Sequence, residues 1–300
     1  MDNYIVAGMG EVLWDILPDG KKIGGAPANF AYHVSQFGFE SRVVSAVGED
    51  SLGAEIMDDF RRKGLGCLVE TVPFQTGTVQ VKLDSEGVPR YDIKEDVAWD
   101  NIPFTPALES LARLTRAVCF GSLAQRSHVS HRTICRFLDT MPDGEGRLKV
   151  FDINLRQDFY SREILDESLR RCNVLKINDE ELEVVSSLFG LPDSSQEERC
   201  RNMIDRYCLS VLILTCGVKG SFVFTPERTS FLGTPHVKVA DTVGAGDSFT
   251  AAFVSGMLGG LDLVEAHRLA VDTSAFVCTM DGAMPVLPAA LKSRVGNDRA

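Results

Sequence analysis

The sequence has no apolar run that approaches the roughly 20 residues needed to cross a bilayer. It begins Met1-Asp2-Asn3-Tyr4, without the basic segment and apolar run of a secretory signal. None of its eight cysteines forms a C-x-x-C pair, and several lie within apolar runs. We therefore predict a soluble, cytoplasmic protein whose thiols are reduced and buried.

Basic residues are also in short supply. The chain has 31 Lys and Arg residues against 42 Asp and Glu residues, a formal net charge of -11. A surface this negative repels nucleic acid and anionic membranes, so neither is expected as a partner. An anionic ligand would need positive potential concentrated locally, at a helix N-terminus or at a few cations.

Several common ligand-binding motifs are absent or incomplete. No G-x-x-x-x-G-K-[ST] string occurs, so phosphates are not held by a Walker loop. Gly8-Met9-Gly10 is followed by Leu13, where a dinucleotide fingerprint requires glycine. His128-x-x-His131 with Cys135 has a metal-like spacing. No fourth ligand is evident, however, and the polar neighbours indicate an exposed helix start, so we do not expect zinc there.

Apolar runs alternate with amphipathic segments along most of the chain. The runs read as parallel strands covered on both faces, at 4–9, 42–47, 117–120, 148–153, 174–177 and 211–215. Helices are expected at 26–37, 52–63, 130–139, 162–171, 179–188 and 197–207. This alternation predicts a single α/β domain over residues 1–300, a doubly wound and mostly parallel sheet sandwiched by helices.

Two segments depart from this alternation. Residues 78–84 alternate apolar and polar side chains, 85–87 form a turn, and 88–93 return, which predicts an antiparallel hairpin. Residues 11–16 show a similar pattern. We predict that insertions around 11–25 and 72–100 form a small β-sheet lid with few apolar partners of its own. Its exposed edges favour a homodimer through the lid.

The stretch Asp241-Thr242-Val243-Gly244-Ala245-Gly246-Asp247 precedes an apolar helical run. Glycines let backbone N–H groups approach a ligand without interference from a Cβ atom. At a helix N-terminus these groups form a socket for an anion. A carboxylate in the first turn, at Asp247, can accept a proton from an attacking hydroxyl. An acidic residue that only stabilises the helix N-terminus would give the same local pattern.

The same stretch resembles the C-terminal signature of the ribokinase-like (PfkB) carbohydrate kinases. Further similar motifs follow one another in the family's order over about the whole chain: Gly24-Gly25-Ala26-Pro27-Ala28-Asn29, Asp152-Ile153-Asn154-Leu155-Arg156, Asn178-Asp179-Glu180-Glu181, Thr215-Cys216-Gly217 and Gly282-Ala283. The resemblance implies a ribokinase-like fold and an enzyme that transfers a phosphoryl group from ATP to a sugar hydroxyl.

The resemblance also implies roles for individual residues. Asp247 would be the general base. Gly244, Ala245 and Gly246 would form the anion hole, and Arg156 would reach the phosphates or the sugar. The sugar is expected to contact Asp15, Gly25, Asn29, Asn154 and Asp247. ATP is expected to contact Asn178, Thr215, Gly217, Lys219 and Ser274, the last of these on the final helix.

The resemblance also implies a magnesium site and raises the question of a potassium site. Glu181, with Asn178, would organise Mg²⁺ largely through water. Potassium in some members binds near Asp241, Val243 and Gly282. Met280 and Val286 stand where Arg and Ser are common in the family. Carbonyl ligands survive such changes whereas a Ser side-chain ligand does not, so potassium binding stays open.

Four of the residues assigned to the site also have a purely structural explanation. Asn178 and Glu181 suit a solvated helix start, Arg156 a surface ion pair, and Asp15 the turn before Pro18. The residues of three motifs, Gly10–Asp15, Gly25–Asn29 and Asp152–Arg156, are most similar to those of the fructokinase branch. A 2-keto-3-deoxygluconate kinase, another sugar or nucleoside kinase, and a non-catalytic sugar-binding regulator are the alternatives.

Overall fold

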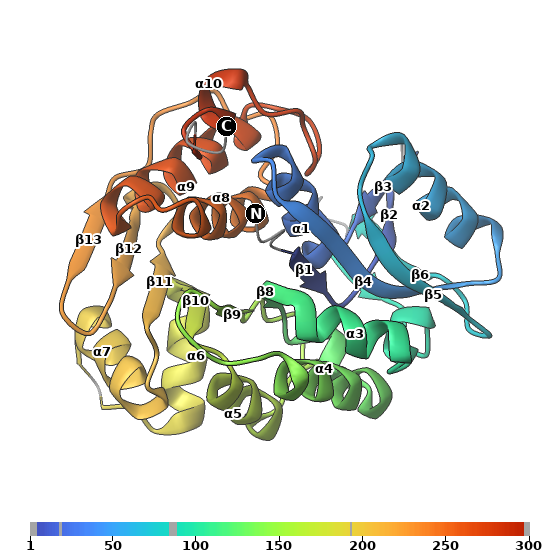
Figure 1. Ribbon diagram of the computed structural model, residues 1–300, viewed down its shortest axis with the longest axis horizontal. Helices are drawn as coiled ribbons and strands as arrows, with labels where there is room; N and C mark the ends of the chain where they lie inside the picture. Colours follow the sequence, from blue (N-terminus) through green and yellow to red (C-terminus); the bar gives the residue numbers. More distant parts are fainter. Residues whose placement is uncertain (1–4, 18–19, 84–88, 193, 297–300) are drawn as a thin grey trace.

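The computed structural model describes residues 5–17, 20–83, 89–192 and 194–296 (Figure 1). Within these ranges the chain forms one large and one small β-sheet with helices around them. Figure 1 shows the large sheet running through the centre, with helices above and below it. The expected α/β sandwich is confirmed.

The large sheet has nine strands in the order β13-β12-β11-β10-β9-β8-β1-β4-β5. The strands from β11 to β5 are parallel, and only β12 and β13 add in antiparallel fashion at one edge. Their bounds are β1 Ile5–Met9, β4 Glu40–Gly48, β5 Cys67–Val72, β8 Thr115–Phe120, β9 Leu148–Asp152, β10 Val174–Asn178, β11 Val211–Thr215, β12 Ser221–Phe224 and β13 Thr229–Leu232. The six strands predicted from apolar runs are all present.

The helices surround this sheet. The α-helices are α1 Ala26–Gln36, α2 Ser51–Arg62, α3 Pro106–Leu114, α4 His128–Thr140, α5 Arg162–Arg171, α6 Asp179–Phe189, α7 Gln196–Tyr207, α8 Ala245–Leu258, α9 Leu263–Cys278 and α10 Ala289–Lys292. Short 3-10 turns occupy Ala98–Asn101 (η1), Leu123–Arg126 (η2) and Gly217–Lys219 (η3). Gly38 (φ 85°) and Gly64 (φ 63°) adopt the left-handed conformation after α1 and α2, as their glycines suggested.

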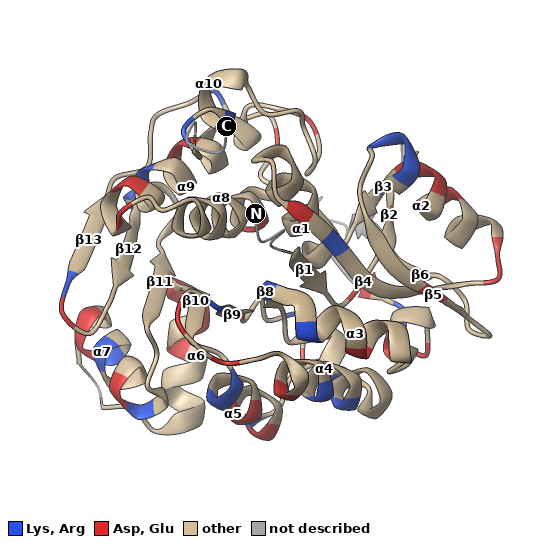
Figure 2. Cartoon of the chain, in the orientation of Figure 1, with Lys and Arg blue, Asp and Glu red and all other residues tan. Residues whose placement is uncertain are grey.

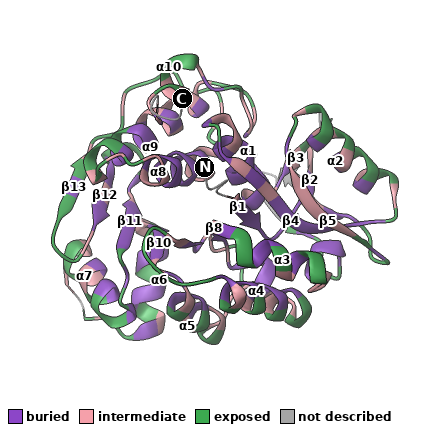
Figure 3. Cartoon of the chain, viewed as in Figure 1, coloured by how far each residue is buried: buried purple, intermediate pink, exposed green. Residues whose placement is uncertain are grey.

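Successive strand residues supply two separate cores. Leu175 and Ile177 of β10 join one apolar cluster, which contains the buried faces of α3 to α7. Val174 joins another, with α1, α8 and α9. Because side chains alternate between the faces of a strand, a continuous apolar run fills both cores. Figure 3 shows the buried strands between helices whose outer sides are exposed.

The small sheet has the order β3-β2-β6-β7, with bounds β2 Leu13–Leu17, β3 Gly20–Gly24, β6 Gly77–Leu83 and β7 Pro89–Ile93. The predicted hairpin is present as the antiparallel pair β6–β7, while β2 and β6 are parallel. The predicted turn at 85–87 lies outside the described residues. The expectation of few apolar partners is wrong, because Leu13, Val79 and Ile93 are buried in the main core.

The structure also tests the predictions that the thiols are buried and that no segment crosses a membrane. All eight cysteines are free, but only Cys119, Cys172, Cys200 and Cys216 are buried. The expectation that all the thiols are buried is therefore wrong, and Cys208 is exposed. Among the described residues, no helix has the length and apolar character to cross a membrane.

Candidate active site

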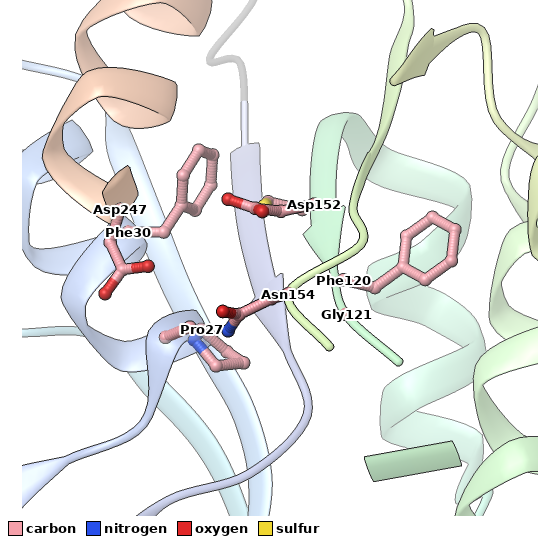
Figure 4. A pocket seen from close by; sticks show the side chains of 9 residues that line it. Pro27, Phe30, Phe120, Gly121, Asp152, Asn154 and Asp247 are labelled. Carbon is pink, nitrogen blue, oxygen red and sulfur yellow. The ribbon is translucent and has the colours of Figure 1, made fainter. Parts of the chain in front are cut away.

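The carboxyl ends of the central strands meet the N-terminus of α8. A small pocket there is lined by Ala26, Pro27, Phe30, Cys119, Phe120, Gly121, Asp152, Asn154 and Asp247. In Figure 4 the side chains of Asp247, Asp152 and Asn154 face one space from different elements. Open parallel sheets bind ligands at this edge, where helices and strands both present their functional ends. The motif residues quoted from distant parts of the sequence therefore converge.

Asp247 lies in the first turn of α8. Its Oδ2 accepts a 2.7 Å hydrogen bond from Nδ2 of Asn29 in α1. Burial and the negative charge of Asp152 raise the pKa of Asp247 to about 6. The Asn29 hydrogen bond and the charges of Lys176 and Arg156 oppose this rise. A carboxylate with such a pKa is ionised at neutral pH and is still basic enough to take a proton.

The glycines before Asp247 are required by close contacts. Gly244 is the N-cap of α8 with φ 77°, and a Cβ atom there would lie 2.8 Å from the Cα of Ala283. A Cβ atom on Gly246 would lie 3.0 Å from Nζ of Lys176. With Ala245, whose N–H donates to the carbonyl of Thr242 at 3.3 Å, these residues form the start of the helix beside Asp247. N–H groups in a first helical turn lack partners within the helix and favour anions.

A buried charge network lies directly beneath this turn. Nζ of Lys176 in β10 donates a 3.0 Å hydrogen bond to Oδ1 of Asp152 in β9, and Thr250 Oγ1 donates to Oδ2 of Asp152 at 3.2 Å. Burial favours the neutral amine, but the carboxylates of Asp152 and Glu181 outweigh it and raise the pKa of Lys176. Lys176 is therefore a fixed positive charge under the glycine turn. Sequence reasoning missed it, although a lysine inside an apolar strand was a visible signal.

Asn178 and Glu181 form a capping box at the start of α6. Glu181 Oε2 accepts from the N–H of Asn178 and Oε1 from the N–H of Leu155, both at 3.0 Å. Glu181 is 7% exposed, so this is not a solvated helix start. Burial raises the pKa of Glu181, against the charge of Lys176. Each carboxylate oxygen keeps a lone pair beside its backbone bond, which suits contact with a hydrated cation through water.

Arg156 follows β9 and Asp15 lies in the small sheet, and the two are close enough for their charges to interact. Arg156 is exposed, and its charge lowers the pKa values of Glu11, Asp15 and Asp247. Burial raises the pKa of Asp15 against this effect. Asp15 lies in β2, opposite Lys22 of β3, and its Oδ2 would be 2.5 Å from a Cβ atom on Gly24. The absence of a side chain at Gly24 thus leaves room for this carboxylate, and Asp15 belongs to the strand, not to the turn.

Two buried polar atoms in this region have no hydrogen-bond partner among the described residues, Oε2 of Glu11 and Oδ1 of Asn29. Burial raises the pKa of Glu11 to about 7. Gly25, the N-cap of α1 with φ 116°, lies against the Glu11 carbonyl, where a Cβ atom would come within 2.4 Å. Unpartnered buried polar groups at a cleft are available to a ligand. Glu11 is a second residue that sequence reasoning did not assign.

The residues expected at the nucleotide lie further along the sheet edge. Thr215 ends β11, and η3 follows with Gly217 at φ 53°. The carbonyl of Gly217 accepts a 2.6 Å hydrogen bond from Thr234. Lys219 is exposed, with Nζ 3.8 Å from Oδ2 of Asp179. Ser274 lies on α9 and not on the final helix, because the short α10 follows.

Asp241, Val243 and Gly282 come together. Asp241 Oδ1 accepts from the N–H of Val243 at 3.0 Å, and Oδ2 accepts from the N–H of Gly282 at 3.2 Å. Partial burial would raise the pKa of Asp241, but these backbone donors and Lys22 hold it below its usual value. The two loops named from the sequence are thus joined through one carboxylate.

Comparisons with known proteins find carbohydrate kinases with similar sequences and a similar fold. The family model described as pfkB family carbohydrate kinase matches residues 19–290. A fructokinase of Salmonella typhimurium is 28% identical over 299 residues, covering 93% of this chain and 95% of its own. An ATP-dependent 6-phosphofructokinase of Thermoanaerobacterium thermosaccharolyticum is 27% identical over 303 residues, covering 95% and 91%. The crystal structure of a Pyrococcus horikoshii sugar kinase in complex with ATP superposes with a TM-score of 0.78 at 26% identity, covering 93% and 94%.

Proposed function

Since the chain belongs to the pfkB family of carbohydrate kinases, we propose that it transfers the terminal phosphoryl group of ATP to a hydroxyl of fructose. The observation that carries this proposal is the position of Asp247. This carboxylate, with its raised pKa, lies at the N-terminus of α8 beside the glycine turn. A base for the attacking hydroxyl and a socket for the transferred group are therefore adjacent.

In this mechanism Asp247 accepts the proton of the sugar hydroxyl as that oxygen attacks the terminal phosphorus. The bond between this phosphorus and the bridging oxygen of ADP breaks. The N–H groups of Gly244, Ala245 and Gly246 stabilise the charge on the transferred group. Lys176 adds a fixed positive charge beneath them. Phosphoryl transfer depends mainly on positioning and charge neutralisation, which these groups supply.

Magnesium fits this site through water. Glu181 and Asn178 are the residues that would hold a hydrated Mg²⁺, and both are fixed by their mutual hydrogen bonds. When bound, the ion neutralises charge on the phosphate oxygens. Potassium would occupy the neighbourhood of Asp241, Val243 and Gly282, whose backbone groups lie together. Potassium dependence stays a prediction.

ATP would lie along the sheet edge beyond α8. Asn178 and Thr215 end the neighbouring strands β10 and β11. Gly217, Lys219 and Ser274 would line the nucleotide, with Lys219 and Arg156 as exposed cations able to reach phosphates. Such local cations meet the need for positive potential on an acidic protein.

The sugar would lie between the small sheet and the N-termini of α1 and α8. Asp15, Asn29, Asn154 and the backbone of Gly25 offer acceptors and donors for its hydroxyls, and one carboxylate can accept two hydrogen bonds. The small sheet would act as a lid on this single-domain kinase. Dimerisation through the lid, in the cytoplasm, is part of the same proposal.

Charge favours a neutral sugar over an acid or a sugar phosphate. Glu11, Asp15 and Asp247 all feel the charge of Arg156, and burial raises the pKa of all three. A carboxylate or phosphate on the acceptor would be repelled by those that are ionised. This argues for fructose over 2-keto-3-deoxygluconate or fructose 6-phosphate. The chain is similar to the Salmonella fructokinase and to the Thermoanaerobacterium 6-phosphofructokinase to about the same degree, so the charge argument and not the similarity makes this choice.

An ATP-consumption assay tests the proposal. The assay compares five acceptors: fructose, ribose, adenosine, 2-keto-3-deoxygluconate and fructose 6-phosphate. The Asp247→Asn variant is the blank. The highest kcat/KM is expected with fructose. A higher value with a charged acceptor would overturn the substrate assignment. Sugar binding without turnover of any acceptor would indicate a sugar-binding regulator.

A further inference from the structure

A cluster of potential metal ligands lies on the outer helices, apart from the kinase cleft. His131 and Cys135 are one turn apart on α4, and Glu167 lies on the neighbouring α5. Figure 1 shows these two helices side by side below the large sheet. One ligand atom from each of the three residues lies within 4.8 Å of the other two. The cluster lines a surface pocket together with His128 and Arg132.

The distances approach those of a tetrahedral zinc site. Nε2 of His131 is 3.3 Å from Oε2 of Glu167. Sγ of Cys135 is 3.8 Å from Nε2 of His131 and 3.9 Å from Oε2 of Glu167. Zinc bonds of about 2.0–2.3 Å at tetrahedral angles place ligand atoms about 3.3–3.6 Å apart. Sγ of Cys135 is also 4.0 Å from Nδ1 of His131, so it lies beside the ring and would have to rotate about χ1 to reach an ion held by Nε2 and Glu167.

The neighbours of His131 fix the ring in the form that a metal needs. Nε2 of the buried Gln125 donates to the carbonyl of Gly121 at 2.8 Å, which leaves Oε1 as an acceptor. Oε1 lies 3.0 Å from Nδ1 of His131, so this ring nitrogen is the donor. In the neutral imidazole the Nε2 lone pair is then free for a metal, with Oε2 of Glu167 3.3 Å away. A buried partner that orients the second ring nitrogen is typical of histidines that bind metals.

An ion pair between protonated His131 and Glu167 is the competing explanation. It accounts for the 3.3 Å distance but gives Cys135 no role. Basic side chains are nearby, and Figure 2 shows them on both α4 and α5. Nη1 of Arg171 lies 3.5 Å from Oε2 of Glu167, and its Nε bonds Asp139 at 3.0 Å. Arg171 contacts the same Oε2 that faces His131, so with a metal at Oε2 the guanidinium would pair with Oε1 of Glu167 instead.

We propose that His131, Cys135 and Glu167 bind a zinc ion, with the fourth position open to water. Imidazole, thiolate and carboxylate are the ligand types that zinc accepts. As the sulfur–zinc bond forms, the Cys135 thiol loses its proton to solvent. The ion would link α4 to α5. The spacing of His128, His131 and Cys135 did not predict zinc, because no further ligand was evident in the sequence, and Glu167 comes from another helix.

Binding of Zn²⁺ and of Co²⁺ to the full chain tests the site. Co²⁺ reports geometry, because a tetrahedral thiolate site gives intense visible bands and a near-ultraviolet sulfur-to-cobalt charge-transfer band. One equivalent is expected for each chain, and Zn²⁺ should displace Co²⁺. Cys135→Ser should abolish the charge-transfer band. Cys135→Ser and Glu167→Gln should each weaken Zn²⁺ binding by more than about tenfold, the lower end of the loss seen even for outer-shell partners.

The matched control is Cys208→Ser, which removes an exposed thiol at the end of α7. It should leave the bands and the affinity unchanged. Zinc should also protect Cys135, and not Cys208, from alkylation followed by mass spectrometry. Circular dichroism checks that each variant is folded. If Cys135→Ser does not fold, Glu167→Gln, a change at a surface residue, still tests the site. Absence of the charge-transfer band, or its loss in Cys208→Ser, would leave only the ion pair and overturn the proposal.

Discussion

The amide of Asn29 and the carboxylate of Asp247 join the first turns of α1 and α8 through a 2.7 Å hydrogen bond. These residues are 218 positions apart in the sequence. The bond fixes the carboxylate and donates to its ionised form, which lowers the pKa of Asp247 against burial and the charge of Asp152. The remaining Asn29 oxygen has no partner among the residues that the structure describes. In the proposed mechanism Asn29 would thus position the base and offer an acceptor to the substrate.

Activity should therefore fall in acid as Asp247 is protonated. With its pKa at about 6 in the free protein, kcat/KM should rise with pH through this range and level off above it. Removing the Asn29 donor disfavours the charged form, so Asn29→Ala should move the acid limb to higher pH. The measurement is the pH profile of kcat/KM for fructose. Asn202→Ala, at an exposed asparagine on α7, is the matched control and should leave the profile unchanged. An unshifted limb in Asn29→Ala would show that this hydrogen bond does not tune the base.

Asp247→Asn should preserve folding and ATP binding but reduce turnover. A positioned general base contributes about 10²–10⁴ in rate, and the asparagine retains the size of the side chain. Steady-state kinetics with fructose, with calorimetry for ATP, make the measurement. Turnover within a few-fold of the wild type would remove Asp247 from the role of base.

Asp15→Ala should mainly impair the use of sugar. Each hydrogen bond to a charged acceptor contributes about 1.5–3 kcal/mol, so KM for fructose should rise about tenfold or more. ATP affinity should change little, because the nucleotide would lie at the other end of the sheet edge. Asp205→Ala, on the exposed face of α7, controls for a general loss of negative charge. Weaker ATP binding with unchanged sugar affinity would show that Asp15 is misplaced.

Much of this site follows from the sequence, for a physical reason. Continuous apolar runs predicted parallel strands, and the ends of parallel strands meet at one edge, so residues after different strands converge. The glycines before α8 predicted a turn whose backbone can approach an anion, but an ordinary helix start gives the same local pattern. The role of this turn and of Asp247 followed from the resemblance to the carbohydrate kinases.

The buried partners could not be read in this way. Lys176 faces Asp152 because β10 and β9 are neighbours and these two residues are in register. Strand order and register depend on the whole chain, so the sequence shows an unusual lysine but not its partner. The antiparallel strands β12 and β13, each four residues long, were not predicted either, and at the edge strand β13 Phe231 is exposed.

This pair leads to a stability prediction. Lys176→Met removes the charge but keeps the length of the side chain, so Asp152 and Glu181 remain buried without their cation. Losing one partner of a buried pair costs about 3–5 kcal/mol. The double variant Lys176→Met/Asp152→Asn should recover part of this loss. Urea unfolding gives the free energies. Arg113→Met, which breaks the exposed pair with Glu109, should cost at most about 1 kcal/mol. A loss as small in Lys176→Met would show that the buried network does not stabilise the fold.

The last prediction concerns closure of the small sheet over the sugar. Its inner strands are anchored, because Leu13 of β2 and Val79 of β6 are buried in the main core. β3 is an edge strand with exposed residues, and Lys22 ties it to Asp281 by a 2.6 Å ion pair at the surface. Ile93 of β7 is buried in the same core, so motion should be confined to the edge strand β3 and not involve the whole sheet. Excluding water would keep Asp247 from activating it and would strengthen the field of the glycine turn. In hydrogen exchange, amides of β3 should exchange fast in the free protein and slow when fructose is added, whereas those of β10 should not change. Protection by ATP alone, or none by fructose, would show that this sheet is not the sugar lid.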